Sequence, residues 1–271
     1  MMKRLVGIYR ETEYSPGRHE SNDALLLEEV AERLRASGLK VDLMTLPETD
    51  RAPNDARLVF SMCQGREALI RLAEWERNGV TVVNRPPAAL NTHRDRLPAI
   101  MERAGVPFPR TQLFDTAKGP NGALLANGSG FWLKRGDVHA STSSDVQWLP
   151  SPESLDGAIA QFRARGIAYA AVQEHCAGDE IKFYGVGEGS FFHWFYSRRK
   201  NGSHVDEEAL ADLARRAARA VSLTIFGGDV IVDAEGNLTL IDLNDWPSFA
   251  PCRETASAAI AEIIRERVHA G

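Results

Sequence analysis

The first 85 residues repeat one pattern, in which a short apolar run is followed by a longer amphipathic stretch. The longer stretches predict helices, because apolar residues such as Leu26, Val30 and Leu34 recur at helical spacing and a glycine closes each stretch. The apolar runs predict four strands, RLVGIYR, KVDLMTL, ARLVFSMC and VTVVN. Strands that alternate with helices in this way predict a parallel sheet, whose ligand-contacting loops follow the carboxyl ends of its strands.

The pattern changes at the double proline Pro86-Pro87, which marks a predicted domain boundary. A helix is predicted over residues 91–105, with Thr92 as its N-cap. Strands dominate beyond it, interrupted by two more predicted helices over residues 151–166 and 206–223. The second part of the chain is therefore organised differently from the first.

The composition is that of an ordinary globular protein, with 271 residues, 44% hydrophobic and 25% charged. A net charge of −5 gives no reason to expect a nucleic acid or an anionic membrane as a partner. No apolar run is long enough for a membrane span and the first residues lack a signal-peptide pattern, so we expect a soluble, cytoplasmic protein. The cysteines Cys63, Cys176 and Cys252 lack metal-binding spacing and are expected to be reduced thiols.

The segment FGGDVIVDAEGNLTLIDLND predicts a β-hairpin that turns at residues 234–237. A turn centred between residues 235 and 236 pairs Asp229 directly with Asp242. Asn244 falls on the same side of its strand as Asp242, because side chains two apart face the same way. Two facing carboxylates repel unless a cation lies between them, and oxygen ligands without His or Cys favour Mg²⁺ or Mn²⁺.

The alternative is a surface hairpin with solvated acids, but apolar neighbours such as Val230 and Leu240 argue against a solvated ribbon. Phosphate commonly completes the ligand shell of such an ion, so cations and backbone donors are expected nearby. Lys134, which ends the strand FWLKR, and the small, polar loop over residues 136–144 fit that expectation. A lysine at a strand end is often merely exposed, but the apolar run before Lys134 indicates that it emerges from a buried strand.

Four segments, taken in order, resemble the ATP-grasp superfamily, with its glutathione synthetase-like ATP-binding fold. They are NRPPAALNTHRDRLPAIMERAGVPFPRT, FWLKR, AVQEHCAGDEIKFYGVG and FGGDVIVDAEGNLTLIDLN. In turn they are similar to the family's lead-in helix, phosphate-binding strand, adenine-holding linker and metal-binding hairpin. The resemblance implies an α/β chain with an N-terminal parallel-sheet domain over residues 1–86, followed by an ATP-grasp lobe A over 87–179 and a lobe B over 180–271.

The resemblance also implies a role for each matching residue in binding ATP and Mg²⁺ or Mn²⁺. Lys134 would contact the α- and β-phosphates, and Glu180, or in its place Asp179, would bind the ribose hydroxyls. The backbone of Glu174 and Cys176 would contact the edge of the adenine, with Gln173 beside it. The metal ligands that it implies are Asp229, Asp242 and Asn244.

The chain departs from the family pattern in three places. The family's Asp-Lys pair in the lead-in helix is Asp95-Arg96 here, which makes Arg96 the implied phosphate contact. The loop over residues 136–144 is poorer in glycine than the family's lid loop, and His139 is its candidate nucleotide contact. The metal hairpin carries Asp242 where the family usually has Glu, and Asp-x-Asn at this place also resembles inositol polyphosphate kinases.

Most ATP-grasp proteins convert a carboxylate to an acylphosphate, which an amine or a thiol then attacks. The resemblance therefore implies a ligase, similar to those that modify a ribosomal protein, with ATP and a small-molecule or peptide acceptor as partners. Lys182 and Arg198, with Lys134, are the expected catalytic cations, because they suit a carboxylate or an acylphosphate. Arg10 and Arg199 are further candidates for contacts to the acceptor.

Two alternatives stay open at this point. One is a small-molecule kinase of the inositol phosphate type, which phosphorylates a hydroxyl, and the other is a nucleotide-binding protein without turnover. The sequence does not identify the acceptor, and it is compatible with a homo-oligomer.

Overall fold

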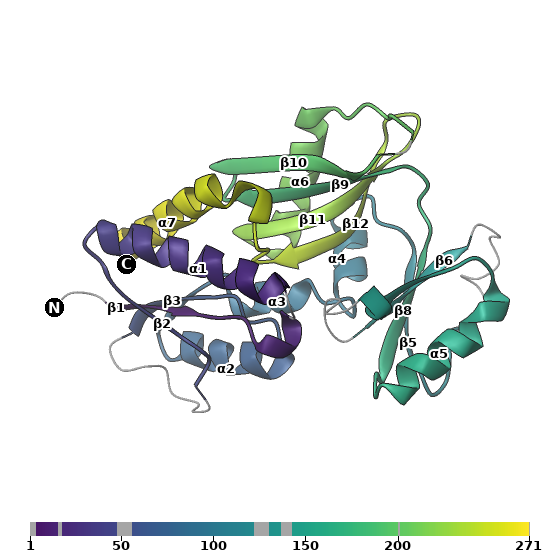
Figure 1. Ribbon diagram of the computed structural model, residues 1–271, viewed down its shortest axis with the longest axis horizontal. Coiled ribbons are helices and arrows are strands. Elements are labelled where there is room, and N and C mark those ends of the chain that lie inside the picture. The colour runs from purple at the N-terminus through teal and green to yellow at the C-terminus, as the bar shows by residue number, and fades with distance from the viewer. Residues whose placement is uncertain are drawn as a thin grey trace.

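The computed structural model describes residues 4–15, 18–47, 56–121, 130–136, 143–199 and 201–270, with the backbone alone for residues 18–21 and 143. Three four-stranded sheets and their covering helices make up this part of the chain (Figure 1). The N-terminal sheet has the order β2-β1-β3-β4, and its strands are parallel, as the sequence pattern predicts. Its strands are β1 (Arg4–Ile8), β2 (Lys40–Met44), β3 (Ala56–Ser61) and β4 (Thr81–Val83).

Helices cross over between these parallel strands, namely α1 (Arg18–Ala36) and α2 (Arg66–Arg77). Each helix buries its apolar side against the sheet, for example through Leu26 and Val30 of α1 and Leu72 of α2. The helical spacing of apolar residues thus sets which side of each helix faces the sheet.

The middle sheet has the order β5-β8-β6-β7 and is antiparallel. Its strands are β5 (Thr111–Asp115), β6 (Phe131–Arg135), β7 (Val146–Leu149) and β8 (Tyr169–Glu174). The helix α5 (Leu155–Ala164) covers one face, where Phe131 and Leu133 pack against Phe162. This sheet and α5 stand at the end of the molecule that is far from both termini (Figure 1).

The C-terminal sheet is also antiparallel, with the order β10-β9-β11-β12. Its strands are β9 (Asp179–Val186), β10 (Phe191–Arg198), β11 (Ile225–Val232) and β12 (Leu238–Asp245). Ile181 and Phe183 on β9 are buried against the helix α6 (Glu207–Val221), whereas the alternating Glu180 and Lys182 point to the other face. One face of this sheet is therefore a core and the other carries polar groups.

The last helix, α7 (Arg253–Ala270), returns to the N-terminal sheet and lies beside α1 (Figure 1). Arg33 of α1 donates from Nε to Ser257 Oγ of α7 at 2.8 Å. The core beneath these helices also contains Ile225 and Trp246 from the C-terminal sheet and the loop after it. The N-terminal and C-terminal sheets thus share one core.

The helix predicted over residues 91–105 is wrong in its limits. The structure has two shorter helices, α3 (Pro86–Asn91) and α4 (Leu97–Arg103), with a turn between them. Thr92 does not begin a helix, and its hydroxyl donates to the Ala89 carbonyl at the end of α3. A proline stands in the first turn of both helices, where its fixed φ angle favours a helix start.

The predicted α/β fold class, with a parallel N-terminal sheet, is confirmed. In the parts of the chain described here, every helix is too short or too polar to cross a lipid bilayer.

Candidate functional site

A cavity of about 520 Å³ lies between the middle sheet and the C-terminal sheet, and we call it the inter-sheet cavity. It is lined by β6, by the linker between β8 and β9, by the C-terminal sheet and by the turn before α4. The sequence-predicted residues that line it are Lys134, Gln173, Glu174, Cys176, Glu180, Arg198, Asp229 and Asp242. The structure therefore brings most of the implied nucleotide and metal contacts to one place.

The hairpin of β11 and β12 places Asp229 opposite Asp242, as the strand register predicts. On the turn side of this pair, Val230 is opposite Leu240, so Ile241 is an extra residue in β12 and forms a β-bulge. Because of the bulge, Ile241 and Asp242 both line the inter-sheet cavity, although neighbours in a regular strand face opposite sides.

Each of the two carboxylates has a cation beside it. Lys182 Nζ lies 2.6 Å from Asp229 Oδ1, and Arg94 Nη2 lies 3.3 Å from Asp242 Oδ2. Burial raises the pKa of Asp229, against the attraction of Lys182, and the charge of Asp242 raises it further. Burial by itself would lower the pKa of Lys182, but the attraction of Asp229 raises it overall. The protein's own cations thus compensate the facing acids.

The oxygen ligands of this site suit Mg²⁺. Both carboxylate side chains are less than one-fifth exposed, at 17% for Asp229 and 18% for Asp242. Mg²⁺ is commonly bound through one or two carboxylates, with water and phosphate oxygens as its other ligands. Across the described ranges, no three His, Cys, Asp or Glu side chains gather in a way that could hold a metal. The donor set therefore fits an ion that binds together with a phosphate.

Lys134 emerges from β6 on the side of the inter-sheet cavity, and it is only 7% exposed. Its ammonium donates to the Ile241 carbonyl at 3.5 Å, across the gap between the two sheets. Burial lowers the pKa of Lys134 to about 8, although the charge of Asp242 acts in the opposite direction. A buried ammonium of this kind attracts a phosphate strongly, because little water screens it.

The linker after β8 forms one end of the cavity. This end is far from Arg135, the last residue of β6. Gln173 donates from Nε2 to Thr111 Oγ1 at 3.0 Å, which fixes its side chain. The Glu174 N–H donates to the Arg110 carbonyl at 3.0 Å, so this N–H is directed at β5 and away from a ligand. Burial raises the pKa of Cys176, which therefore remains a thiol at neutral pH.

The two candidate ribose acids have different surroundings. Asp179 is fully buried, and its carboxylate accepts from the N–H groups of Asn201 and Ser203, both at 2.8 Å. Glu180 points into the inter-sheet cavity, and Ser197 Oγ donates to it at 2.9 Å. Asp179 holds the chain after β10, and Glu180 is the acid that a ligand could reach.

Arg94, which the sequence reasoning missed, lines the cavity, whereas Arg96 is exposed and is not among its described lining residues. Arg94 donates from Nη1 to the Arg135 carbonyl at 2.9 Å and contacts Asp242, so it bridges the two sheets. The turn that precedes α4 determines which arginine points inward. Two arginines separated by one residue offer no sequence signal that tells them apart.

Four further candidates are Lys182, Asn244, His139 and Arg199. Lys182 and Asn244 share the polar face of the C-terminal sheet but are not among the described residues that line the cavity. His139 falls outside the described residues, as does most of the predicted lid loop. Arg199, a candidate acceptor contact, lies 4.7 Å from the centre of the Tyr196 ring.

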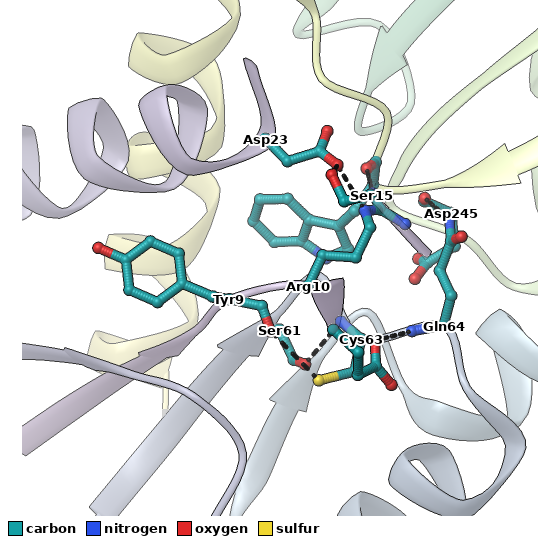
Figure 2. A network of polar contacts seen from close by, with 10 residues as sticks. Tyr9, Arg10, Ser15, Asp23, Ser61, Cys63, Gln64 and Asp245 are labelled. Carbon is teal, nitrogen blue, oxygen red and sulfur yellow. Dashed lines mark hydrogen bonds and ion pairs between the residues drawn. The ribbon is translucent and has the colours of Figure 1, made fainter. Parts of the chain in front are cut away.

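Arg10, another candidate acceptor contact, is part of a buried polar network (Figure 2). Its guanidinium contacts Asp23 at 2.8 Å and donates to the Trp246 carbonyl, and the side chain is 5% exposed. Gln64 donates in the same network to the Asp245 carbonyl at 3.4 Å. Arg10 therefore connects the N-terminal sheet to the end of β12 and is covered from solvent.

A larger cavity, of about 780 Å³, lies between α2 and the edge of the middle sheet. Three of its charged groups already have partners: Arg66 pairs with Asp95 at 2.8 Å, and Glu11 accepts from the N–H groups of Gln64 and Gly65. The described residues of its lining include no facing carboxylate pair like that of Asp229 and Asp242, so the inter-sheet cavity is the better candidate site.

Comparison with known proteins agrees with this geometry. No family profile matches the chain, and no curated protein matches it. Among solved structures, a RimK-domain ATP-grasp protein from Sphaerobacter thermophilus has a TM-score of 0.73 at 16% sequence identity, over 96% of this chain and 99% of that one. The chain has the ATP-grasp fold. The resemblance found in the sequence is thereby confirmed for the fold.

Other proteins with the ATP-grasp fold are ligases by name. The D-alanine–D-alanine ligase of Bacillus anthracis, solved with ATP, has a TM-score of 0.72 at 11% identity, over 99% of this chain and 100% of that one. The ATP-grasp ligase PsnB, solved with a minimal precursor, Mg and ADP, has a TM-score of 0.62 at 20% identity, over 97% of this chain and 98% of that one. Identities this low support the shared fold alone.

Proposed function

We propose that this protein is a Mg–ATP-dependent ligase that activates a carboxylate as an acylphosphate for attack by an amine or a thiol. One observation carries the proposal: the inter-sheet cavity combines the buried Lys134 and Arg94 with the facing acids Asp229 and Asp242. Cations and metal-binding acids at one end of a cavity suit a triphosphate, because phosphoryl transfer depends mainly on positioning and charge neutralisation.

Different residues of the cavity bind different parts of ATP in this proposal. Lys134 and Arg94 neutralise phosphate oxygens from the middle sheet and the turn before α4, and Glu180 binds the ribose hydroxyls. Asp229 and Asp242 would hold Mg²⁺, and Asn244, two residues beyond Asp242 on the same face of β12, would be a further ligand. When bound, Mg²⁺ neutralises charge that develops on the transferred phosphoryl group. Lys182 pairs with Asp229 in this structure, and with a metal ion on Asp229 its ammonium would be available to the acceptor.

In the reaction that we propose, a carboxylate oxygen of the acceptor attacks the γ-phosphorus of ATP, and the bond to the β-phosphate oxygen breaks to give ADP. The amine or thiol of the second substrate then attacks the acylphosphate carbon and releases phosphate. Arg198, at the end of β10 and on the cavity lining, stabilises the negative charge of the acylphosphate. Because PsnB was also solved with the precursor peptide PsnA2, we propose a peptide as the acceptor.

The test is turnover of Mg–ATP with a panel of amino acids, peptides, hydroxy acids and inositol phosphates, with ADP and free phosphate measured separately. Free phosphate that appears only when a carboxylate and an amine or thiol are both present supports the ligase. Formation of ADP with a phosphorylated hydroxyl and no free phosphate contradicts it and supports the kinase. ATP binding without turnover on any panel member contradicts catalysis.

Asp242→Asn tests whether this turnover takes place in the inter-sheet cavity. It is expected to reduce turnover by roughly 100-fold or more, because it removes a charge that positions Mg²⁺. The matched control is Asp212→Asn, since Asp212 is an exposed acid on α6 that lies away from the cavity. Equal losses in the two variants would show that the activity depends on another site.

A further inference from the structure

The strand β10, at the edge of the C-terminal sheet, is rich in aromatic side chains. Each of its first six residues has a ring, and the first acid, lysine or arginine in the strand is Arg198. In the strand order β10-β9-β11-β12 it stands at one end, and Figure 1 shows it as the outermost strand of this sheet. In the described part of the chain, one long side of β10 therefore has no neighbouring strand.

The rings of β10 cover both faces of the sheet edge. On the α6 side, Phe192, Trp194 and Tyr196 pack against the core beneath that helix, and the ring centres of Trp194 and Tyr196 are 5.5 Å apart. On the other face, Phe195 stacks with Tyr184 of β9, with ring centres 6.2 Å apart. Rings at these distances hold each other in place, so the edge has a defined shape.

The apolar layer under α6 is incomplete at β10. On β9, Ile181 and Phe183 are fully buried, whereas the residues opposite them on β10, Tyr196 and Trp194, are only partly buried. The difference arises because β9 has a strand on each side and β10 has a strand on one side. A further strand beside β10 would remove more of these two rings from water, which is favourable in proportion to the apolar area buried.

The other sheet edges of the described chain are protected in ways that β10 is not. The edge strands β4 and β7 have only three and four residues. The edge strand β2 contains Lys40 and Asp42, β5 ends at Asp115, and β12 carries Asp242 and Asp245. Short strands and charged side chains prevent one sheet edge from pairing with another. β10 has eight residues and rings in place of charges, which favours a strand as its partner.

A second copy of this chain supplies a strand of matching shape. If two copies are related by a two-fold axis perpendicular to the sheet, their β10 strands run antiparallel to each other. This rotation keeps both α6 helices on the same face, so Trp194 and Tyr196 of the two copies join one apolar layer. The outward N–H and C=O groups of each strand bond to those of the other. Two four-stranded sheets then form one continuous sheet.

The two ends of β10 carry opposite charges, which suits this antiparallel arrangement. Glu188 lies in the turn before the strand and is 72% exposed, with Arg219 at 3.5 Å as an exposed partner. Arg199 directly follows the strand and is exposed beside the Tyr196 ring. Antiparallel pairing brings Glu188 of each copy toward Arg199 of the other, whereas parallel pairing would bring like charges together. A second copy carries this complementary pattern necessarily, and an unrelated peptide does not.

We propose that β10 is a self-association surface, through which two copies of this chain pair their edge strands antiparallel and form a dimer. The inference goes beyond the proposed function and does not depend on it. Trp194, Glu188 and Arg199 are not among the described residues that line the inter-sheet cavity.

Sedimentation velocity of the full chain over a series of concentrations tests the dimer. The unaltered protein is expected to sediment increasingly as a dimer as its concentration rises. Trp194→Lys places a charge on the open edge and is expected to weaken self-association by roughly tenfold or more. Trp148→Lys is the matched control, because Trp148 is a 41% exposed tryptophan on the edge strand of the middle sheet, and it should leave self-association unchanged.

An exchange of charges tests the identity of the partner, and it serves if Trp194→Lys does not fold. Glu188→Arg and Arg199→Glu should each weaken the dimer by roughly threefold or more, since each puts like charges together at both ends of a two-fold interface. The double variant should recover most of the affinity. A mixture of the two single variants should form a mixed dimer more readily than either variant alone associates with itself, because opposite charges then meet at both ends.

Each result supports or overturns the inference. A monomer at every concentration, or a dimer that Trp194→Lys leaves unchanged, overturns it. Equal losses in Trp194→Lys and Trp148→Lys also overturn it, because the interface then lies away from β10. A double variant and a mixture that both remain monomeric overturn the antiparallel pairing of two copies, and leave another kind of partner for this edge. The proposed function is tested separately, by turnover of Mg–ATP.

Discussion

The C-terminal sheet and the middle sheet each form one wall of the inter-sheet cavity, but they are attached to the rest of the molecule in different ways. The C-terminal sheet shares a core with the N-terminal sheet, through residues such as Ile225 and Trp246. Among the described residues, the core of the middle sheet is formed by residues from Phe114 to Val172. Of the contacts described above, the polar ones from Arg94 and Lys134 link the middle sheet to its surroundings.

This difference indicates which wall moves when a ligand binds. A wall with its own core can shift as a unit, because a shift does not open packed apolar surface elsewhere. The C-terminal sheet shares its core with the N-terminal sheet and is therefore held in place by that sheet. We therefore expect the carboxylate pair to be fixed on the C-terminal sheet, and the wall with Lys134 and Trp132 to close over the nucleotide.

The largest effect is expected at the shared core. Trp246 is fully buried, stacks on Phe60 with ring centres 6.4 Å apart, and donates from Nε1 to the Val83 carbonyl at 3.1 Å. Trp246→Ala should reduce the free energy of unfolding by about 4 kcal/mol, through lost burial and a cavity. Denaturant unfolding followed by circular dichroism measures the loss. Trp148→Ala, which removes a partly exposed indole, is the matched control and should cost much less.

A second comparison tests whether the middle sheet unfolds separately. Leu133 in the middle sheet and Ile225 in the shared core of the C-terminal sheet are both fully buried. Substitution of either residue by Ala should cost about 3 kcal/mol. Hydrogen exchange should show loss of protection confined to the middle sheet for Leu133→Ala, and spread over both other sheets for Ile225→Ala. Spread of the Leu133→Ala effect into the N-terminal sheet would contradict the separate core.

The junction of the N-terminal and C-terminal sheets is expected to be sensitive to pH. Asp245 is buried, with the neutral amide of Asn84 at 2.6 Å as a partner, whereas the buried Asp145 of the middle sheet pairs with Arg165. Burial raises the pKa of Asp245 to about 7, against its hydrogen bond with Asn84. The folded state thus binds this proton more tightly than the unfolded state does, so the contribution of Asp245 to stability is largest at low pH and falls as pH rises toward 7.

Asp245→Asn should remove this dependence. In the unaltered protein, Asp245 contributes a loss of up to about 1.4 kcal/mol per pH unit between roughly pH 4 and 7. The variant cannot ionise there, so the difference in unfolding free energy between the two proteins should grow with pH. Denaturant titrations at several pH values measure it. Curves that run parallel from pH 4 to pH 7 would rule out a raised pKa.

The smallest effect is expected at the ion pair between Arg66 of α2 and Asp95 of the turn before α4. The two groups are 2.8 Å apart, but the side chains are 43% and 27% exposed. Asp95→Asn should change the free energy of unfolding by less than about 1 kcal/mol, and added salt should reduce the difference. A larger and salt-independent effect would mean that this exposed contact holds the sheets together as the buried core does.

Local patterns were sufficient to predict much of the fold. The parallel N-terminal sheet follows from alternating strands and helices, and the pairing of Asp229 with Asp242 follows from the geometry of a hairpin. The observed pairing results from two deviations from a regular hairpin that offset each other. The strands end at Val232 and begin at Leu238, so the turn is centred half a residue earlier than expected, and the bulge at Ile241 restores the pairing.

Contacts between distant segments could not be predicted. Asn84 and Asp245 are separated by 161 positions, and no local periodicity relates them. The choice between Arg94 and Arg96 depends on the turn between α3 and α4, which the sequence pattern had assigned to one continuous helix. The burial of Arg10 required the position of the loop that contains Trp246.

The bulge at Ile241 also has an evolutionary consequence. Without this residue, Val230 would still be opposite Leu240 and Asp229 would still be opposite Asp242, because the insertion lies between these two pairs. Leu240 would remain in the core and Asp242 would remain on the cavity side. A single codon gained or lost at this point therefore changes the wall of the inter-sheet cavity while Asp229 and Asp242 keep their places, so the two parts of the site can diverge independently.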